Sequence, residues 1–212
     1  VDNFKKMTEI KSKNRGVLLG KRPTDYIAGA QGALPYVVNV EDGNWIPYKP
    51  TPEDQYGTGG DRFNCVTQSA QNSIKMLLNE QIMHKKMALG DIQWLNDKGY
   101  IDQFGKVQFS VRFNSITNGT IPGVGNYLYI VGDDLKNTGL IPESMLPDDN
   151  SISSAEYYNI NIITPEMTAL GKEFLTRFKI NYEWLNANNP FIEEMQKALK
   201  QSPVQIVINS GS

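Results

Sequence analysis

Apolar side chains recur at a helical spacing directly after a glycine-rich loop at residues 55–61. They occupy Val66, Ala70, Ile74 and Leu77. This period of three to four residues predicts a helix of about four turns. Cys65 falls in the first turn of that helix.

Two more helices are predicted in the middle of the chain. The stretch 87–98 has Trp94 and Leu95 on its apolar side and is closed by a glycine. A second stretch runs from residue 125 to Gly139, a residue type that is common just past the end of a helix. Residues 140–147 are then expected to form an extended turn.

The last third of the chain predicts two helices and a strand. Thr164 is suited to the N-cap and Pro165 to the first position of a helix. The apolar stripe of this helix comprises Met167, Leu170, Phe174, Leu175 and Phe178. The final helix begins at residues 189–190 and ends before Pro203. Residues 204–208 are rich in β-branched side chains, which predict a strand.

The first 44 residues lack such a period and contain scattered Lys, Asn, Gly and Pro. We interpret residues 1–44 as an N-terminal arm or propeptide-like segment that precedes a domain of residues 45–212. Within the arm, residues 36–40 have strand propensity. Four residues are expected to pack as a staple that leads into the domain: Trp45, Pro47, Tyr48 and Pro50.

Composition excludes several classes of function. The 212 residues are 40% hydrophobic and 21% charged, which is typical of a soluble globular protein. The 21 basic and 23 acidic residues give a net charge of −2, so neither nucleic acid nor an anionic membrane surface is an expected partner. No window approaches the run of about 20 apolar residues that crosses a bilayer.

The chain has one cysteine and one histidine. These counts exclude an internal disulfide and a site of several thiolate or imidazole ligands, so no metal or cofactor is predicted. Unpaired N–H groups and the helix dipole favour an anion in a first turn. We therefore expect a lowered pKa for the Cys65 thiol, with Asn64 or Asp61 as the N-cap. His84 would lie about 30 Å farther along the helix, at the surface.

Four landmarks occur in one order along the chain: Gln55 in the glycine-rich loop, Asn64 with Cys65 at the helix start, residues 139–147, and residues 202–208. This order resembles that of the papain-like (C1-type) cysteine peptidases. Residues 61–70 are also similar to a segment of uncharacterised members that bacteriophages encode. The resemblance extends over residues 45–208.

The resemblance implies an α+β papain-like fold, with a helical left lobe around the Cys65 helix. The right lobe would be an incomplete β-barrel, entered by the strand at residues 204–208. The implied activity is peptide-bond hydrolysis, in which the Cys65 thiolate attacks a carbonyl group. The N–H of Cys65 and the side chain of Gln55 would stabilise the oxyanion, often by about 3 kcal/mol per donor. Glu143 is expected to be a structural carboxylate that accepts backbone hydrogen bonds.

Two features depart from the family pattern. The oxyanion glutamine of typical members stands at the position of Gly59, so the use of Gln55 requires a longer loop. The histidine and asparagine of the family follow the strand that residues 204–208 represent, and the sequence stops at Ser212. Residues 45–212 are therefore interpreted as a papain-like domain that lacks its C-terminal part.

Three explanations stay open: a truncated chain, a chain cut near Ser212 whose remainder stays bound non-covalently, or a pseudo-enzyme. The expected partners are a peptide or protein substrate, a C-terminal remainder of the same polypeptide, or virion proteins. The expected location is a phage virion or the bacterial host cytoplasm. The alternative function is a catalytically inactive papain-like scaffold that acts as a structural or interaction protein of the virion.

Overall fold

The computed structural model of the chain describes residues 16–18, 40–58, 60–185 and 191–207. Most of the predicted N-terminal arm lies outside these ranges, as do residues 189–190, where the last helix was expected to begin. The strand predicted at residues 36–40 also lies outside them, apart from Val40, which is buried and not in a strand.

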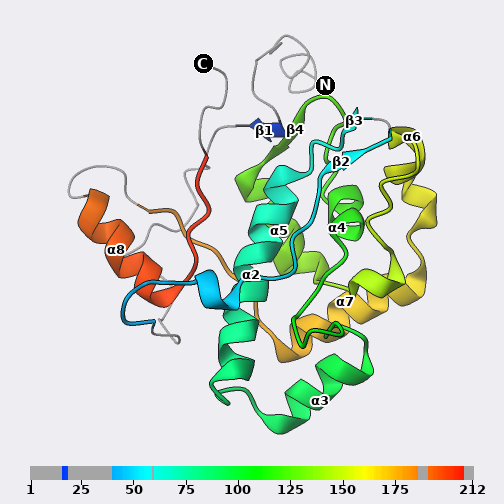
Figure 1. Ribbon diagram of the computed structural model, residues 1–212. Helices are drawn as coiled ribbons and strands as arrows, with labels where there is room; N and C mark the ends of the chain where they lie inside the picture. The colour runs from blue at the N-terminus through cyan, green and yellow to red at the C-terminus, as the bar shows by residue number, and fades with distance from the viewer. Residues whose placement is uncertain (1–15, 19–39, 59, 186–190, 208–212) are drawn as a thin grey trace.

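Helix α2 (Cys65–Met83) is the longest described element, and the other helices gather around it (Figure 1). They are α3 (Leu89–Asp97), α4 (Val111–Thr117), α5 (Leu128–Thr138), α6 (Ser154–Tyr157), α7 (Pro165–Arg177) and α8 (Phe191–Gln201). Three short 3₁₀ segments are also present: η1 (Ile46–Tyr48), η2 (Glu143–Met145) and η3 (Ile160–Ile162). Helix α2 packs against α4 and α5, and α5 packs against α7.

The helix ends largely follow the signals in the sequence. Helix α7 begins at Pro165, and the Thr164 hydroxyl accepts a hydrogen bond from the N–H of Met167 at 3.3 Å. Helix α5 ends at Gly139, whose φ of 81° is left-handed and favours glycine. Helix α2 begins at Cys65, as predicted, and α3 falls within the predicted stretch 87–98.

The start of the predicted helix at residue 125 is wrong, because residues 125–127 form a strand. Strand β4 (Gly125–Tyr127) pairs in parallel with β1 (Gly16–Leu18). A second, antiparallel sheet joins β2 (Tyr56–Gly57) to β3 (Gly60–Asp61). The mixture of helices and small sheets agrees with the α+β class.

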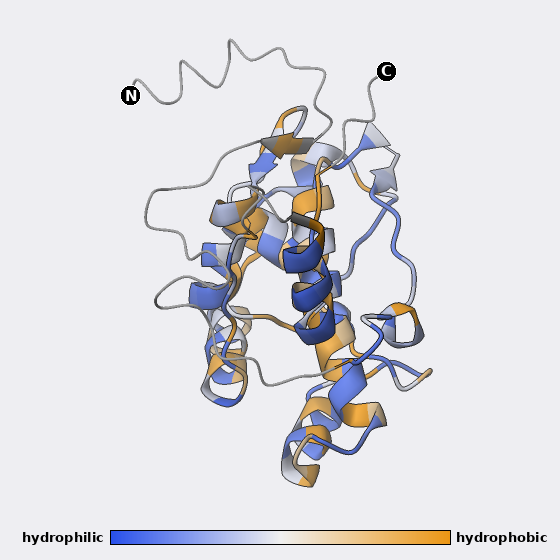
Figure 2. Cartoon of the chain, turned by 90° about the vertical axis from the view of Figure 1, so that its left-hand side faces the viewer, coloured by the Kyte–Doolittle hydropathy of each residue, from blue (hydrophilic) through white to orange (hydrophobic). Residues whose placement is uncertain are grey.

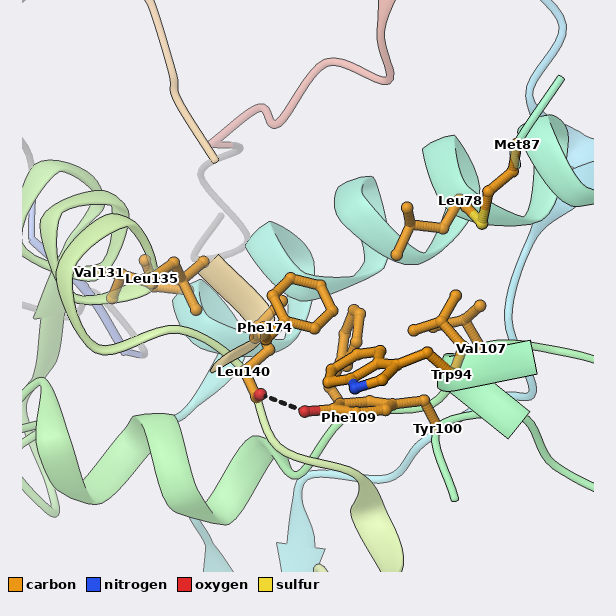
Figure 3. Packing of buried hydrophobic residues seen from close by; sticks show 12 residues of the cluster. Leu78, Met87, Trp94, Tyr100, Val107, Phe109, Val131, Leu135, Leu140 and Phe174 are labelled. Atoms are coloured by element: carbon orange, nitrogen blue, oxygen red, sulfur yellow. Dashed lines mark hydrogen bonds between the residues drawn. The ribbon is translucent and has the colours of Figure 1, made fainter. Parts of the chain in front are cut away.

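A cluster of aromatic side chains forms the centre of the main core (Figure 3). The rings of Trp94 and Tyr100 stack with their centroids 5.3 Å apart, and Phe109 meets Phe174 edge-on at 5.6 Å. The Tyr100 hydroxyl donates a hydrogen bond to the carbonyl of Leu140 at 2.8 Å. Its polar end is thereby satisfied inside an apolar region.

The predicted staple before the domain is confirmed for Trp45 and Tyr48, which belong to a small core, whereas Pro47 is exposed. Trp45 is buried, and its indole N–H donates to the carbonyl of Leu199 on α8 at 2.6 Å. Trp45 and Val40 form a small core with partly buried side chains of α2 and α8. The amphipathic character that such packing requires is visible in Figure 2, where the larger helices carry both polar and apolar positions.

The predicted right-hand lobe is not found in the described ranges. Residues 204–207 do not form a strand, and the two sheets of the described part have two strands each, so they form no barrel. Ile206 and Val207 are 63% and 39% exposed. Strand propensity is insufficient here because a strand needs a partner for its N–H and C=O groups.

Candidate active site at the start of helix α2

Cys65 is the first residue of α2, and its side chain is partly buried. The backbone N–H groups of Cys65 and Val66 face the sulfur atom and favour its anionic form. Two residues earlier, Phe63 has a φ of 58°, which is left-handed and costly for an aromatic residue. Its N–H donates to the Asp61 carboxylate at 2.7 Å. This turn directs the chain into the helix.

The expectation of a lowered pKa for Cys65 is wrong. Burial raises the pKa of the thiol, and the nearby Asp61 carboxylate raises it further. The two backbone N–H groups act in the opposite direction but are outweighed. The helix start alone therefore does not keep Cys65 ionised, and a base is required to deprotonate its thiol near neutral pH.

Gln55 lies in the same neighbourhood as the thiol. The N–H of Arg62 donates to the Gln55 carbonyl at 2.9 Å across the β2–β3 hairpin, which brings residue 55 back toward the helix start. The Gln55 side chain donates to the Asp61 carboxylate at 3.4 Å. Gln55 and Cys65 thus share Asp61 as a neighbour, while the role of Gln55 as an oxyanion donor stays a prediction.

Neither residue expected to cap α2 does so with its side chain. Asn64 occupies the N-cap position, but its amide nitrogen donates to the Tyr157 hydroxyl at 3.0 Å. Asp61 accepts from Phe63, one turn too early to cap the helix. Because Asn64 is fully buried, its side chain serves a contact with α6 rather than the helix end.

The chain after α8 crosses the first turn of α2. The Gln205 side chain donates to the carbonyl of Val66 at 3.1 Å and also bonds the Ser69 hydroxyl. Figure 1 shows this red segment running upward beside α2. Gln205 therefore lies against the N-terminal part of α2, which begins with Cys65.

A buried region rich in polar and charged side chains lies close to the start of α2. The sequence alone did not predict it. The fully buried Arg62 donates to the carbonyl of Ile152 at 2.6 Å and lies over the Tyr157 ring at 4.7 Å. Lys75, in the middle of α2, is also fully buried and pairs with Glu53. A lysine in an amphipathic helix normally faces solvent. The burial of Lys75 becomes evident only from its ion pair with Glu53, which lies in another segment of the chain.

The remaining titratable candidates fall as expected. His84 is exposed at the C-terminal end of α2, where it meets the Tyr48 hydroxyl at 2.9 Å. Glu143 accepts a hydrogen bond from the N–H of Asp148, which confirms its structural role.

Within the described ranges, no group of His, Cys, Asp and Glu could hold a metal ion. None of the helices described is long and apolar enough to span a membrane.

Comparison with known proteins gave no match to a family model, a curated protein or a solved structure. The function is therefore argued from the residues at the start of α2 and from their geometry.

Proposed function

We propose that this chain carries the nucleophile half of a papain-like cysteine peptidase, with Cys65 as the attacking thiol. The observation that supports the proposal best is the position of Cys65. It opens the longest described helix, is partly accessible, and has two backbone N–H groups directed at its sulfur. The resemblance in the order of landmarks along the chain adds to this argument.

On this proposal, each step of the reaction falls to particular residues of this chain. The Cys65 thiolate would attack the carbonyl of a peptide or protein substrate and form a thioester, and the amine would leave. The N–H of Cys65 and the Gln55 side chain are the proposed donors to the oxyanion. Water would then hydrolyse the thioester and regenerate the thiol.

The raised pKa of Cys65 makes a base indispensable to this proposal. His84 is the single histidine of the printed sequence, and along a helix of this length it lies about 28 Å away. The base must therefore come from another polypeptide segment. Residues 203–207, which cross the first turn of α2, are the proposed docking place for that segment.

A second candidate function is a papain-like scaffold that binds other virion proteins without catalysis. The observation that favours it is the carboxylate of Asp61 beside the thiol, because an anion there opposes formation of a thiolate. On this proposal, Cys65 would be a partly buried side chain without a catalytic role.

The two functions differ in the fate of an activated peptide thioester. Because Cys65 needs a base, the peptidase proposal predicts that added imidazole produces a rapid release of one equivalent of thiol per chain, followed by turnover above the rate of imidazole alone. The Cys65→Ser variant serves as the control and should show neither. Absence of the initial release in the wild-type chain, with or without imidazole, would favour the scaffold.

A further inference from the structure

Arg62 lies between strand β3 and the start of α2, and its side chain is fully buried. An arginine is rarely buried unless partners satisfy its N–H groups and its charge. The guanidinium donates to the carbonyls of Ile152 at 2.6 Å and Asp149 at 3.3 Å, and to the hydroxyl of Ser154 at 3.3 Å. One planar group thereby ties the chain before Cys65 to the start of α6.

The backbone of Arg62 is also held on both sides. Its N–H donates to the carbonyl of Gln55 at 2.9 Å across the β2–β3 hairpin, and its carbonyl accepts the Tyr158 hydroxyl. Gly57 of the same hairpin lies directly against the guanidinium, because a Cβ added at Gly57 would come within 2.1 Å of one of the guanidinium nitrogens. Arg62 therefore fixes the chain at Gln55 as well as its own position.

The turn between Arg62 and Cys65 needs such support. Phe63 has a φ of 58°, and a residue with a side chain keeps a left-handed backbone only where the surrounding structure imposes it. Arg62 holds the chain before Phe63. After it, the buried Asn64 donates to the Tyr157 hydroxyl at 3.0 Å. If Phe63 relaxed, the following peptide groups would rotate, and with them the N–H of Cys65.

We propose that Arg62 is a positioning residue that sets the geometry of both proposed oxyanion donors, the N–H of Cys65 and the side chain of Gln55. It acts on Cys65 through the turn at Phe63 and on Gln55 through the hairpin hydrogen bond. An oxyanion is stabilised best by donors that are held in place before the reaction. The inference rests on the proposed peptidase function, because these donors have a role only if Cys65 attacks a carbonyl group.

Arg112 of α4 provides a matched control. It is also buried, and its guanidinium lies over the same Tyr157 ring, 5.3 Å from the centroid compared with 4.7 Å for Arg62. Arg112 donates to the carbonyls of Tyr157 and Glu156. These contacts hold α6 and not the turn before Cys65. The two arginines are therefore alike in burial and chemistry but differ in the segment that they hold.

Two reactions of the same thiol separate the geometry of the site from the ionisation of Cys65. In acylation by p-nitrophenyl acetate, the thiolate attacks the carbonyl, an oxyanion forms, and p-nitrophenolate leaves. Alkylation by iodoacetamide displaces iodide and forms no oxyanion. Both reactions need the thiolate, so the ratio of their rates at one pH cancels the ionised fraction. In the full wild-type chain, this ratio should exceed that of a short cysteine peptide by at least about tenfold.

The variant Arg62→Lys keeps the positive charge but replaces the planar fork, which reaches three partners, with a single ammonium group. We expect it to lower the ratio of acylation to alkylation about tenfold. Arg112→Lys should keep the wild-type ratio. Urea unfolding of both variants measures what each substitution costs the fold. A similar loss of stability in both, with a lower ratio in Arg62→Lys alone, is the result that a positioning role predicts.

Tyr158→Phe tests the same turn with a smaller change and decides the question if Arg62→Lys does not fold. It removes only the hydroxyl that donates to the Arg62 carbonyl and should lower the ratio about threefold. A wild-type ratio in a folded Arg62→Lys, or in Tyr158→Phe where Arg62→Lys is unfolded, would overturn the role of Arg62. An equal drop in Arg112→Lys would also overturn it.

The wild-type chain separates failure of this inference from failure of the proposed function. If its ratio is no higher than that of the cysteine peptide, Cys65 has no oxyanion donors, and the proposed function falls together with the role of Arg62. If its ratio is higher but does not respond to Arg62→Lys or Tyr158→Phe, the proposed function stands and only the role of Arg62 is wrong.

Discussion

The two interior regions to which α2 contributes side chains are built from opposite chemistry. The core around Trp94, Tyr100 and Phe174 is largely apolar, and the Tyr100 hydroxyl in it donates a hydrogen bond to the carbonyl of Leu140. The region behind Cys65 buries Lys75 and Arg62 among carboxylates. The first region depends mainly on the burial and packing of rings, whereas the second contains carboxyl groups whose pKa burial raises. The second region should therefore respond to pH more strongly than the first.

Truncation of Phe174 is expected to have the largest effect. Phe174 is fully buried and contacts the rings of Trp94, Tyr100 and Phe109. Phe174→Ala should reduce the free energy of unfolding by about 4 kcal/mol through lost burial and a cavity. Urea unfolding should give the same loss at pH 5 and pH 8. A loss that depends strongly on pH would remove the distinction between the two regions.

Replacement of Lys75 should have a smaller effect that depends on pH. Lys75→Met leaves the Glu53 charge buried without its partner, which should cost about 3 kcal/mol at pH 8. The loss should be smaller at pH 5, because burial already raises the pKa of Glu53 and the group can take up a proton.

The double variant Glu53→Leu with Lys75→Met serves as the control for the lysine experiment. It removes both charges and should recover most of the stability, as apolar replacements of buried pairs often do. If the double variant unfolds as easily as Lys75→Met, the shape of the side chains rather than their charge determines the cost.

Removal of the Tyr100 hydroxyl tests a buried polar contact of the apolar core. Tyr100→Phe keeps the ring in place but leaves the buried carbonyl of Leu140 without its donor. We expect a loss of about 1 to 2 kcal/mol in urea unfolding, with no change between pH 5 and pH 8. If Tyr100→Phe leaves the free energy of unfolding unchanged, another group or a water molecule donates a hydrogen bond to this carbonyl.

The smallest expected effect is on the reactivity of Cys65. Asp61→Asn removes the carboxylate that raises the pKa of the thiol, so the thiolate fraction below that pKa should increase. Iodoacetamide should then react about threefold faster at pH 7. Asp97→Asn, on the exposed end of α3, should leave the rate unchanged. A slower reaction in Asp61→Asn would mean that Asp61 activates the thiol.

The sequence predicted the features that depend on neighbouring residues in the chain. Thr164 caps α7, Gly139 closes α5, and Cys65 opens α2 because each signal lies within a turn of the element that it marks. The parallel pairing of β1 with β4 joins segments far apart in the chain, and no local pattern reveals it. Residues 204–207 have strand propensity but do not form a strand.

The same difference between local features and features that depend on distant residues holds at the candidate site. The place of Cys65 in a first turn follows from residue spacing. Its raised pKa does not, because burial and Asp61 oppose the helix end. The burial of Lys75 was also unpredictable, since it depends on Glu53 in a different segment. Three-dimensional neighbours therefore decide the chemistry of a site whose position the sequence indicates.

The most direct test of the account is the concentration dependence of Cys65 labelling by a short peptide vinyl sulfone, followed by mass spectrometry. If the start of α2 is half of a peptide-binding active site, the labelling rate should saturate with reagent, while alkylation by iodoacetamide stays linear. If both reagents react linearly and at rates typical of a partly buried thiol, Cys65 does not belong to a peptide-binding site.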